Sequence, residues 1–245
     1  FNIFGVKSDN NIEEMATEEI AGAISLHHSE GAVQKEARDI LLGALDLGNR
    51  EVEEIMLHRS QIEMISTKSS PNEIFEKCLK SPYTRLPIYE DNPENVIGVL
   101  HAKDVLRSFK GFGLGQPTRK FNVNDMNILE VAMKPYFVPE TTTLDQQMKQ
   151  FLKRKSHFAL VVDEYGDLRG LITLEDILEE IVGQISDEHD VIEQQVKELN
   201  DNSLIVEGNM TIRDLNRQRD WNIPDEEANT VAGLVIHEAQ SIPSE

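Results

Sequence analysis

The sequence is poor in cysteine, in aromatic residues and in long hydrophobic runs. The lone Cys78 excludes an intrachain disulfide and fits a reducing compartment. It follows Ile74 and Phe75 on an expected helix, so we interpret it as a core residue rather than a nucleophile. No segment approaches the roughly 18 apolar residues of a membrane span, and the N-terminus lacks the basic and apolar regions of a signal peptide. The chain itself is therefore expected to be soluble.

Positive charge is scarce as well. The chain has 24 Lys and Arg against 44 Asp and Glu, a net charge of −20, without a long basic run. Nucleic acid is therefore not an expected partner, and neither is an anionic membrane surface. Most of the carboxylates are interpreted as solubilising, and some as facing a dimer interface or an acidic cleft that divalent cations neutralise.

Catalytic motifs are also missing. The sequence contains no G-x-S-x-G elbow, phosphate-binding P-loop, H-E-x-x-H or C-x-x-C pattern. We therefore predict that the chain is not an enzyme. It begins at Phe1 rather than Met and stops at Pro243-Ser-Glu, so we expect a piece of a longer protein.

Two amphipathic helices are expected near the N-terminus, over Ile12–His28 and Val33–Leu47, after a linker that ends at Asn11. Gly48 is expected to end the second helix. The short connection favours an antiparallel hairpin, which buries little by itself and needs a neighbour or a second subunit. Residues 1–50 are therefore predicted to form a linker and an acidic helical hairpin.

A repeated pattern organises the middle of the chain. A constant shift that brings Gly98 onto Gly170 lays Gly98–Leu106 on Gly170–Leu178 and Leu86 on Phe158. We predict a first repeat over residues 51–116 and a second over 117–186, each folding as β-α-β-β-α. The expected elements of the first repeat are strand Glu63–Ser66, helix Pro71–Lys80, strands Leu86–Tyr89 and Val96–His101, and helix Ala102–Phe109. Those of the second are strand Tyr136–Val138, helix Thr143–Lys155, strands Phe158–Val162 and Leu168–Thr173, and helix Leu174–Val182.

Each repeat alone leaves one sheet face uncovered, so the two are expected to pack around a pseudo-twofold axis. The Gly-rich stretch Gly111–Lys120 is the expected linker between them. This symmetry creates two equivalent clefts, each built from both repeats. Because the repeats have diverged, the two clefts need not bind equally well.

The last region, residues 187–245, is predicted to be a connector and the start of a truncated α+β domain. Its expected elements are a helical connector over Gln184–Asn202, strand Ser203–Glu207, helix Met210–Gln218 and a strand or buried helix at Val231–His237. Trp221 is interpreted as a core residue. Asp187–Asp190 has metal-ligand residue types, but we interpret it as a solvated run because no rigid loop supports it.

The segment Gly170–Asp176 crosses from a strand into a helix. A hydroxyl at the first position of a helix, followed one turn later by an aspartate, can bind the hydroxyls of a small polar ligand. Free N–H groups at the same helix end attract an anion. The pattern is weak alone and gains weight from its degenerate upstream copy.

The repeated unit resembles a pair of CBS domains, which are adenosine-nucleotide-binding modules. More specifically, the chain resembles the cytoplasmic part of the CorB/CorC (HlyC/CorC) magnesium and cobalt transport family, whose animal relatives are the cyclin M proteins. The matching segments are Val52–Met56 with Arg59, Tyr83–Tyr89, Lys155–His157 and Gly170–Gly183, followed by Gly183–Asp190 and Thr230–Ile236, which resemble the CorC-type domain. The resemblance implies an α+β fold: tandem CBS domains preceded by a helical hairpin and followed by a partial CorC-type α+β domain.

The resemblance also implies a ligand, ATP with Mg²⁺. Thr173 and Asp176 would bind the ribose side of the nucleotide, and Tyr83 and Arg85 would come from the first repeat, with Arg85 on the phosphates. Each residue has a simpler interpretation: a helix cap for Thr173, a solvated helix face for Asp176 and a surface ion pair for Arg85.

Two positions depart from the family pattern. In the first repeat His101 replaces the hydroxyl residue while Asp104 is retained, so we expect the equivalent cleft to bind nucleotide weakly or not at all. Leu57 stands where the animal relatives have a threonine that faces the base, which removes one polar contact.

The function implied is that of a regulatory module of a magnesium, cobalt or other divalent-cation transporter or efflux protein. We expect a homodimer through the CBS pair, attached to its own N-terminal membrane domain at the cytoplasmic face of the cell membrane, the inner membrane in bacteria. The alternatives are a dimerisation module that needs no nucleotide, or a sensor of AMP or S-adenosylmethionine. The CorC-type domain resembles a flavin-binding fold, but no residue here stands out as a ligand of FAD, so FAD ranks below ATP.

Overall fold

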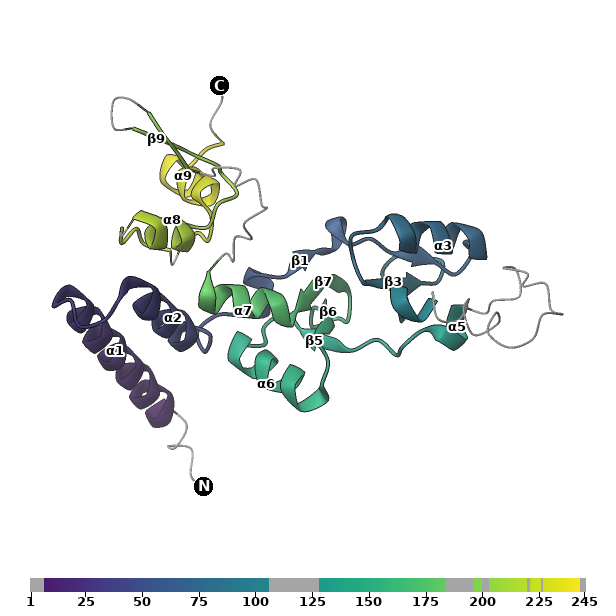
Figure 1. Ribbon diagram of the computed structural model, residues 1–245, viewed down its shortest axis with the longest axis horizontal. Helices are drawn as coiled ribbons and strands as arrows, with labels where there is room; N and C mark the ends of the chain where they lie inside the picture. The colour runs from purple at the N-terminus through teal and green to yellow at the C-terminus, as the bar shows by residue number, and fades with distance from the viewer. Residues whose placement is uncertain are drawn as a thin grey trace. The chain divides into compact units, whose positions relative to one another are not determined.

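The structure is a computed structural model that describes residues 7–105, 128–183, 196–199, 203–219, 221–225 and 227–242 (Figure 1). The chain divides into two compact units. We call residues 48–177 the paired-repeat unit, and residues 1–47 with 178–245 the flanking unit. Within the described residues, no helix is both long enough and apolar enough to cross a membrane.

Two sheets form the paired-repeat unit, one for each repeat. The first has the order β2-β3-β4 and consists of Ile65–Ser66, Arg85–Tyr89 and Val96–His101. The second has the order β1-β7-β6-β5 and consists of Leu57–His58, Leu168–Thr173, Phe158–Val162 and Phe137–Pro139. In each sheet a central antiparallel hairpin, β3–β4 or β6–β7, carries one parallel strand beside its first strand. The α+β architecture with two similar halves is as predicted.

Each sheet forms backbone hydrogen bonds with a short segment of the other repeat; we call this reciprocal pairing the strand exchange. Strand β1 precedes the first repeat's own sheet but pairs with β7 of the second, with Leu57 opposite Leu171. In return, Met133 of the second repeat bridges Val99 of β4, and their backbone N–H groups each donate to the other's carbonyl at 2.9 Å. Since Val99 and Leu171 occupy the same position in the two hairpins, the exchange is reciprocal. The sequence pattern did not predict it.

The hairpins also correct the alignment of the repeats. Arg85 lies opposite His101 in one hairpin, and Phe158 lies opposite Thr173 in the other. Because His101 and Thr173 are equivalent, Phe158 is the counterpart of Arg85, and the constant shift that paired it with Leu86 was wrong by one residue. The turn between the strands is one residue shorter in the second repeat, which restores the match of Gly98 with Gly170.

Three helices of the unit lie where they were predicted: α3 (Pro71–Lys80), α6 (Leu144–Arg154) and α7 (Leu174–Val182). The short helix α5 (Ile128–Val131) and the 3-10 turns at Val52–Glu54 and Arg59–Gln61 were not predicted. Ser70 starts α3 with a reciprocal capping box to Glu73. Of the helix expected from Ala102, residues Ala102–Val105 are helical, and the rest lies outside the described residues. The expected linker Gly111–Lys120 lies outside them as well.

Two apolar clusters hold the paired-repeat unit together. One consists mostly of first-repeat residues, among them Ile65, Ile74 and Cys78, and also contains Ile128 of the second repeat. The prediction of Cys78 as a core residue is confirmed, and burial raises the pKa of its thiol. The other cluster joins the hairpins of the two repeats; it contains Val96, Val99, Phe158, Leu160, Leu168 and Leu171. Removing these side chains from water stabilises the association of the repeats.

The flanking unit begins with two helices, α1 (Lys7–Ser29) and α2 (Lys35–Asp46), as predicted. The linker was expected to reach Asn11, but helix α1 already begins at Lys7. Gly48 was expected to end the second helix as a C-cap glycine. Instead, the C-cap residue of α2 is Leu47, which has a right-handed helical conformation, and Gly48 does not have a positive φ. Helix α2 packs closely on α7: a Cβ at Gly43 would lie 2.8 Å from the Glu180 carbonyl oxygen.

The remaining elements of the flanking unit are β8 (Val196–Glu198), β9 (Leu204–Val206), α8 (Ile212–Arg219) and α9 (Val231–Ala239). Three expectations were wrong. The connector is not helical at Val196–Glu198, which pairs antiparallel with β9. Segment Val231–Ala239 is a helix with no buried residue. Trp221 is 47% exposed, and the buried side chains of this region are Met210, Ile212 and Leu215 instead. The acidic run Asp187–Asp190 lies outside the described residues.

Candidate functional site

A cleft of about 400 Å³ lies within the paired-repeat unit. Both repeats line it. The first contributes Leu57, Ile62, Glu63 and Pro82–Arg85, and the second contributes Phe158, Leu171, Thr173, Glu175 and Asp176. All four residues singled out from the sequence, Tyr83, Arg85, Thr173 and Asp176, are in this lining. The structure therefore brings them together, and their binding of a nucleotide stays a prediction.

Thr173 and Asp176 sit where β7 becomes α7. The backbone N–H of Thr173 donates to Asp176 Oδ2 at 2.7 Å, and the backbone N–H of Asp176 donates to Thr173 Oγ1 at 3.2 Å. This reciprocal pair starts the helix in the manner of a capping box. The simpler interpretation of Thr173 as a helix cap is therefore correct, and the same residue lines the cleft.

Asp176 is partly buried, so its charged form is less well solvated than that of a surface aspartate. Burial raises the pKa of the Asp176 carboxyl above its ordinary value of 3.8, the hydrogen bonds to Thr173 oppose the shift, and the charge of Glu175 adds to it. The ionised carboxylate is an acceptor of hydrogen bonds only. It can therefore accept from two neighbouring hydroxyls of a ligand.

Arg85 lies at the start of β3 and is half-buried. Within the described part of the chain its guanidinium has no hydrogen bond and no ion pair, so the simpler interpretation as a surface ion pair does not hold there. A planar cation with five N–H donors and no internal partner suits a phosphate group. Tyr83, two residues earlier, is 46% exposed and is held through its backbone N–H, which donates to Ser81 Oγ at 3.1 Å.

Of the rest of the lining, only Leu57 was singled out from the sequence, through the family resemblance. Ile62, Phe158 and Leu171 give the cleft apolar walls, as does Leu57, which suits a flat aromatic ring better than a polar group. Leu57 reaches the cleft because β1 joins the second sheet, and no local pattern signals that pairing. Phe158 could have been found by aligning the first strands of the two hairpins separately from the second strands, which makes it the counterpart of Arg85.

The charge of the cleft is mostly negative. Arg85 is the cation among its lining residues, and Glu63, Glu175 and Asp176 are carboxylates. A polyphosphate without a metal ion would be repelled by this set, whereas a complex with a divalent cation would meet less repulsion. Among the described residues, no group of three or more His, Cys, Asp or Glu side chains is arranged to hold a metal ion.

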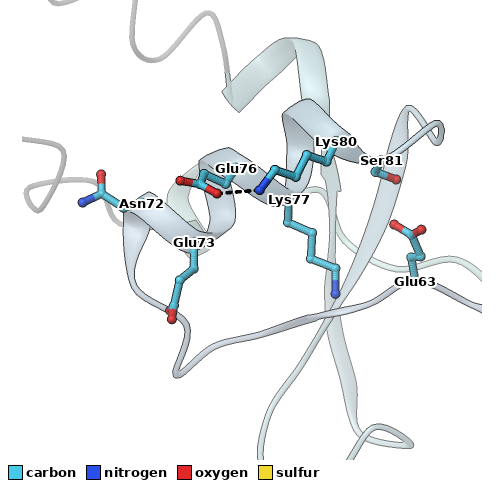
Figure 2. A pocket seen from close by; sticks show the side chains of 7 residues that line it. All are labelled: Glu63, Asn72, Glu73, Glu76, Lys77, Lys80 and Ser81. Atoms are coloured by element: carbon cyan, nitrogen blue, oxygen red, sulfur yellow. Dashed lines mark hydrogen bonds and ion pairs between the residues drawn. The ribbon is translucent and has the colours of Figure 1, made fainter.

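A second hollow of about 450 Å³ shares Glu63 with the cleft. Figure 2 shows the side chains that line this hollow. Helix α3 forms most of its wall. Its two lysines are engaged: Lys77 Nζ donates to the Met64 carbonyl at 2.6 Å, and Lys80 forms an ion pair of 2.8 Å with Glu76. These lysines therefore offer little to the phosphates of a ligand in the cleft.

At the equivalent position of the first repeat, His101 stands in place of Thr173. Its Nδ1 accepts from the backbone N–H of Lys103 at 3.2 Å, so an imidazole takes over the capping role of the hydroxyl. A bulkier ring occupies the space of the threonine side chain. The expected loss of nucleotide binding there stays a prediction.

Comparison with known protein families agrees with this architecture. The CBS domain model matches residues 52–111 and 128–183, and the CorC_HlyC model, described as a transporter associated domain, matches residues 197–245. The magnesium and cobalt efflux protein CorC of Pasteurella multocida is 31% identical over 227 residues, which are 92% of this chain and 72% of that protein. The chain belongs to the CorC/HlyC family of CBS-domain proteins.

Other members are longer. The inner membrane protein YfjD of Escherichia coli is 33% identical over 242 residues, which are 98% of this chain and 54% of that protein. The chain thus spans about half the length of some curated relatives of the CorC/HlyC family.

Solved structures of the family resemble the fold. A CBS domain of the bacterial CNNM/CorC family Mg²⁺ transporter has a TM-score of 0.61 and 30% identity, covering 69% of this chain and 98% of that one. The same kind of domain in complex with ATP has a TM-score of 0.53 and 31% identity, covering 60% of this chain and 97% of that one. That CorC/HlyC-family domain binds ATP.

Proposed function

We propose that this chain is a regulatory module of a divalent-cation transporter or efflux protein, and that it controls the transporter by binding ATP with Mg²⁺ between its two CBS repeats. The observation that carries the proposal is the cleft in which Tyr83, Arg85, Thr173 and Asp176 meet. The ATP complex of a family structure at 31% identity supports the choice of nucleotide. No chemical step is assigned to the module.

We assign different residues of the cleft to different parts of the ATP molecule. Leu57, Phe158 and Leu171 receive the adenine ring, and the carboxylate of Asp176 accepts from the two ribose hydroxyls. Arg85 binds the phosphates, and Mg²⁺ offsets the repulsion from the neighbouring carboxylates. Regulation then requires that ATP bind one arrangement of the module more tightly than another.

The setting of the module is also part of the proposal. The names of relatives as magnesium and cobalt efflux proteins and as an inner membrane protein support attachment to an N-terminal membrane domain, at the cytoplasmic face of the membrane. The paired CBS domains would form a homodimer there. The physiological ion is magnesium or cobalt.

Isothermal calorimetry tests the binding step. We expect ATP with Mg²⁺ to bind the whole chain, and binding to be lost in a variant that combines Thr173→Ile with Arg85→Ala. Thr173→Ile fills the ribose side of the cleft and removes the hydroxyl, while Arg85→Ala removes the phosphate donor. Undiminished binding by the double variant would show that the nucleotide binds elsewhere.

Two alternatives make different predictions. A module that only holds two transporter chains together would leave regulated transport intact when the cleft is blocked. A sensor of AMP or S-adenosylmethionine would bind those ligands more tightly than ATP with Mg²⁺, which competition calorimetry decides. The negative lining of the cleft favours a ligand of low net charge, and this is the observation that keeps S-adenosylmethionine and AMP in consideration.

A further inference from the structure

Helix α8 contributes two arginines to contacts with other parts of the flanking unit. Arg213 and Arg217 lie one turn apart, so their side chains leave the same face of α8. Arg213 forms an ion pair with Asp46, the last residue of α2, and its guanidinium also lies 3.4 Å from the Asp225 carboxylate. Arg217 donates to the Glu180 carbonyl of α7 at 3.2 Å. One face of α8 therefore contacts two helices that lie far away in the sequence.

Arg217 places a positive charge at the C-terminal end of α7. The last carbonyls of a helix have no partner within the helix and carry partial negative charge, and α7 has no basic residue in its last turn. Gly183 follows the helix with a φ of +83°, and its N–H donates to the Glu179 carbonyl at 2.7 Å. A Cβ at Gly183 would lie 2.9 Å from Arg217 Nη1, so the guanidinium lies directly against this turn. Arg217 thus caps α7 from another part of the chain.

Helix α2 packs against the same turn of α7. A Cβ at Gly43 would lie 2.8 Å from the Glu180 carbonyl oxygen and 2.9 Å from that of Ile181. Gly43 is buried, and Asp46, which pairs with Arg213, lies three residues later on the same helix. Helices α2 and α8 therefore meet at the last turn of α7. We call Arg213 and Arg217, with the Asp46 carboxylate and the Glu180 carbonyl, the clasp.

The other end of α7 begins at the cleft. Thr173 and Asp176 cap its first turn and line the cleft, and the helix continues for nine residues to Val182. A ligand that donates hydrogen bonds to the Asp176 carboxylate therefore acts on a group that holds the first turn. Because a short helix moves largely as one body, a change at its first turn also changes the position of its last turn.

We propose that the clasp holds α2 against the last turn of α7, and that through it the C-terminal region responds to ligand binding in the cleft. The response rests on the proposed binding of ATP with Mg²⁺, whereas the holding of α2 does not. Arg213 and Arg217 have separate partners, so both contacts form only when α2 and α7 are correctly placed beside α8. A ligand that orders the first turn of α7 favours the closed clasp, and the closed clasp favours the ligand to the same extent.

Amide hydrogen exchange of the whole chain, measured on peptides from α2, tests the holding of α2. We expect exchange to become about tenfold faster when Arg213→Ala and Arg217→Ala are combined, because two charge-assisted hydrogen bonds are lost. The matched control is Arg219→Ala, which removes the same charge from the same helix but breaks the ion pair with Glu198 of β8 instead. Equal exchange of α2 in the double variant and in the control would overturn the proposal.

An exchange of charges separates the clasp from a general loss of folding. Arg213→Asp places an acidic group beside Asp46 and Asp225, and should also make the exchange of α2 faster. Adding Asp46→Arg restores a pair of opposite charges, so the rate should return towards that of the unaltered chain. A misfolded α8 would not be repaired by a substitution on α2. If Asp46→Arg fails to slow the exchange, α8 does not hold α2 through this pair.

The response to the ligand is measured on the same peptides. ATP with Mg²⁺ should slow the exchange of α2 several-fold in the unaltered chain, and should slow it less in the Arg213→Ala/Arg217→Ala variant. Equal slowing in both chains, or no slowing although calorimetry shows that ATP binds, would overturn the response. Absence of ATP binding to the unaltered chain would instead contradict the proposed function, and the exchange of charges would then decide whether the clasp holds α2.

Discussion

Thr173 and Asp176 bind each other across the first turn of α7, with backbone N–H donors at 2.7 and 3.2 Å from the opposite side chain. The pair starts the helix and also lines the cleft. One consequence is that a substitution at Thr173 changes stability and ligand affinity together. These two effects need separate controls.

We predict that Thr173→Ala lowers the free energy of unfolding by about 1 kcal/mol, the usual cost of losing a helix cap, and weakens ATP binding as well. Thermal denaturation and calorimetry measure the two effects. The matched control is Thr211→Ala, because Thr211 caps α8 with the same spacing and accepts from the Asp214 N–H at 3.0 Å. That variant should lose similar stability and keep its affinity for ATP. Equal loss of affinity in both variants would contradict a direct role for Thr173.

We expect Arg85 to contribute to the binding of the phosphates of ATP and not to the binding of its nucleoside part. We predict that Arg85→Ala weakens binding of ATP with Mg²⁺ by about tenfold or more, the size of a lost charge-assisted hydrogen bond, while adenosine binding changes little. Arg85→Lys should recover only part of the affinity, because an ammonium cannot form the planar two-point contact. Calorimetry with ATP and a nuclear magnetic resonance titration with adenosine compare the ligands. A parallel loss for adenosine would place Arg85 beside the base or ribose instead.

We predict that the carboxylate of Glu63 lowers the affinity of the cleft for ATP without Mg²⁺. This carboxylate lines the cleft with Glu175 and Asp176 against the single cation Arg85, so Glu63→Gln should raise the affinity for metal-free ATP several-fold and reduce the advantage of adding Mg²⁺. Glu76→Gln serves as control, since Glu76 lines the second hollow and pairs with Lys80. Calorimetry with and without Mg²⁺ gives both affinities. An unchanged Mg²⁺ dependence in Glu63→Gln would contradict the role of this carboxylate.

Asp176 sets a pH dependence. Its carboxyl accepts hydroxyl hydrogens only when ionised, and burial raises its pKa above 3.8. Affinity is therefore complete above the raised pKa and falls as the pH decreases through it, at a higher pH than an ordinary aspartate would show. Adenosine is the suitable probe because it has the ribose hydroxyls and no phosphate that titrates. In Asp176→Asn the affinity should be low and flat over the same pH range; a retained pH dependence would assign the titration to another group.

The sequence predicted the elements that local patterns encode. The apolar runs predicted a strand at Leu86–Tyr89, which is observed as Arg85–Tyr89, as well as Val96–His101 and the second repeat's hairpin. Pro71 was correctly predicted as the start of α3. The pairing of β1 with β7 was not predictable in this way, because a strand as short as Leu57–His58 carries no periodicity of its own. Its partner strand also lies far away in the sequence.

The site was predicted in part for the same reason. Thr173, Asp176, Tyr83 and Arg85 lie in recognisable segments, and all four line one cleft. The position of the Glu63 carboxylate in the cleft was not predicted, because it depends on the strand exchange between the repeats. Trp221 shows the opposite error: a large apolar residue was taken for core, although it is 47% exposed. Size and hydrophobicity give a tendency to be buried and do not fix the burial of one residue.

Two glycines at the same position of the two repeats test the strand exchange. A Cβ at Gly170 would lie 2.5 Å from the Leu57 carbonyl oxygen and 2.8 Å from Met56 Sδ, whereas a Cβ at Gly98 would meet the Ala132 Cβ at 3.1 Å. Backbone cannot yield without moving β1, but a neighbouring methyl group can shift by a few tenths of an ångström.

We therefore predict that Gly170→Ala lowers the free energy of unfolding by roughly 1–3 kcal/mol, as overpacking does, and that Gly98→Ala costs less. Gly170→Ala should also weaken ATP binding, since displacing β1 moves Leu57, which lines the cleft. Denaturant unfolding and calorimetry on both variants give the comparison. If the two substitutions cost the same and neither changes ATP affinity, the pairing of β1 with β7 is not what closes the cleft.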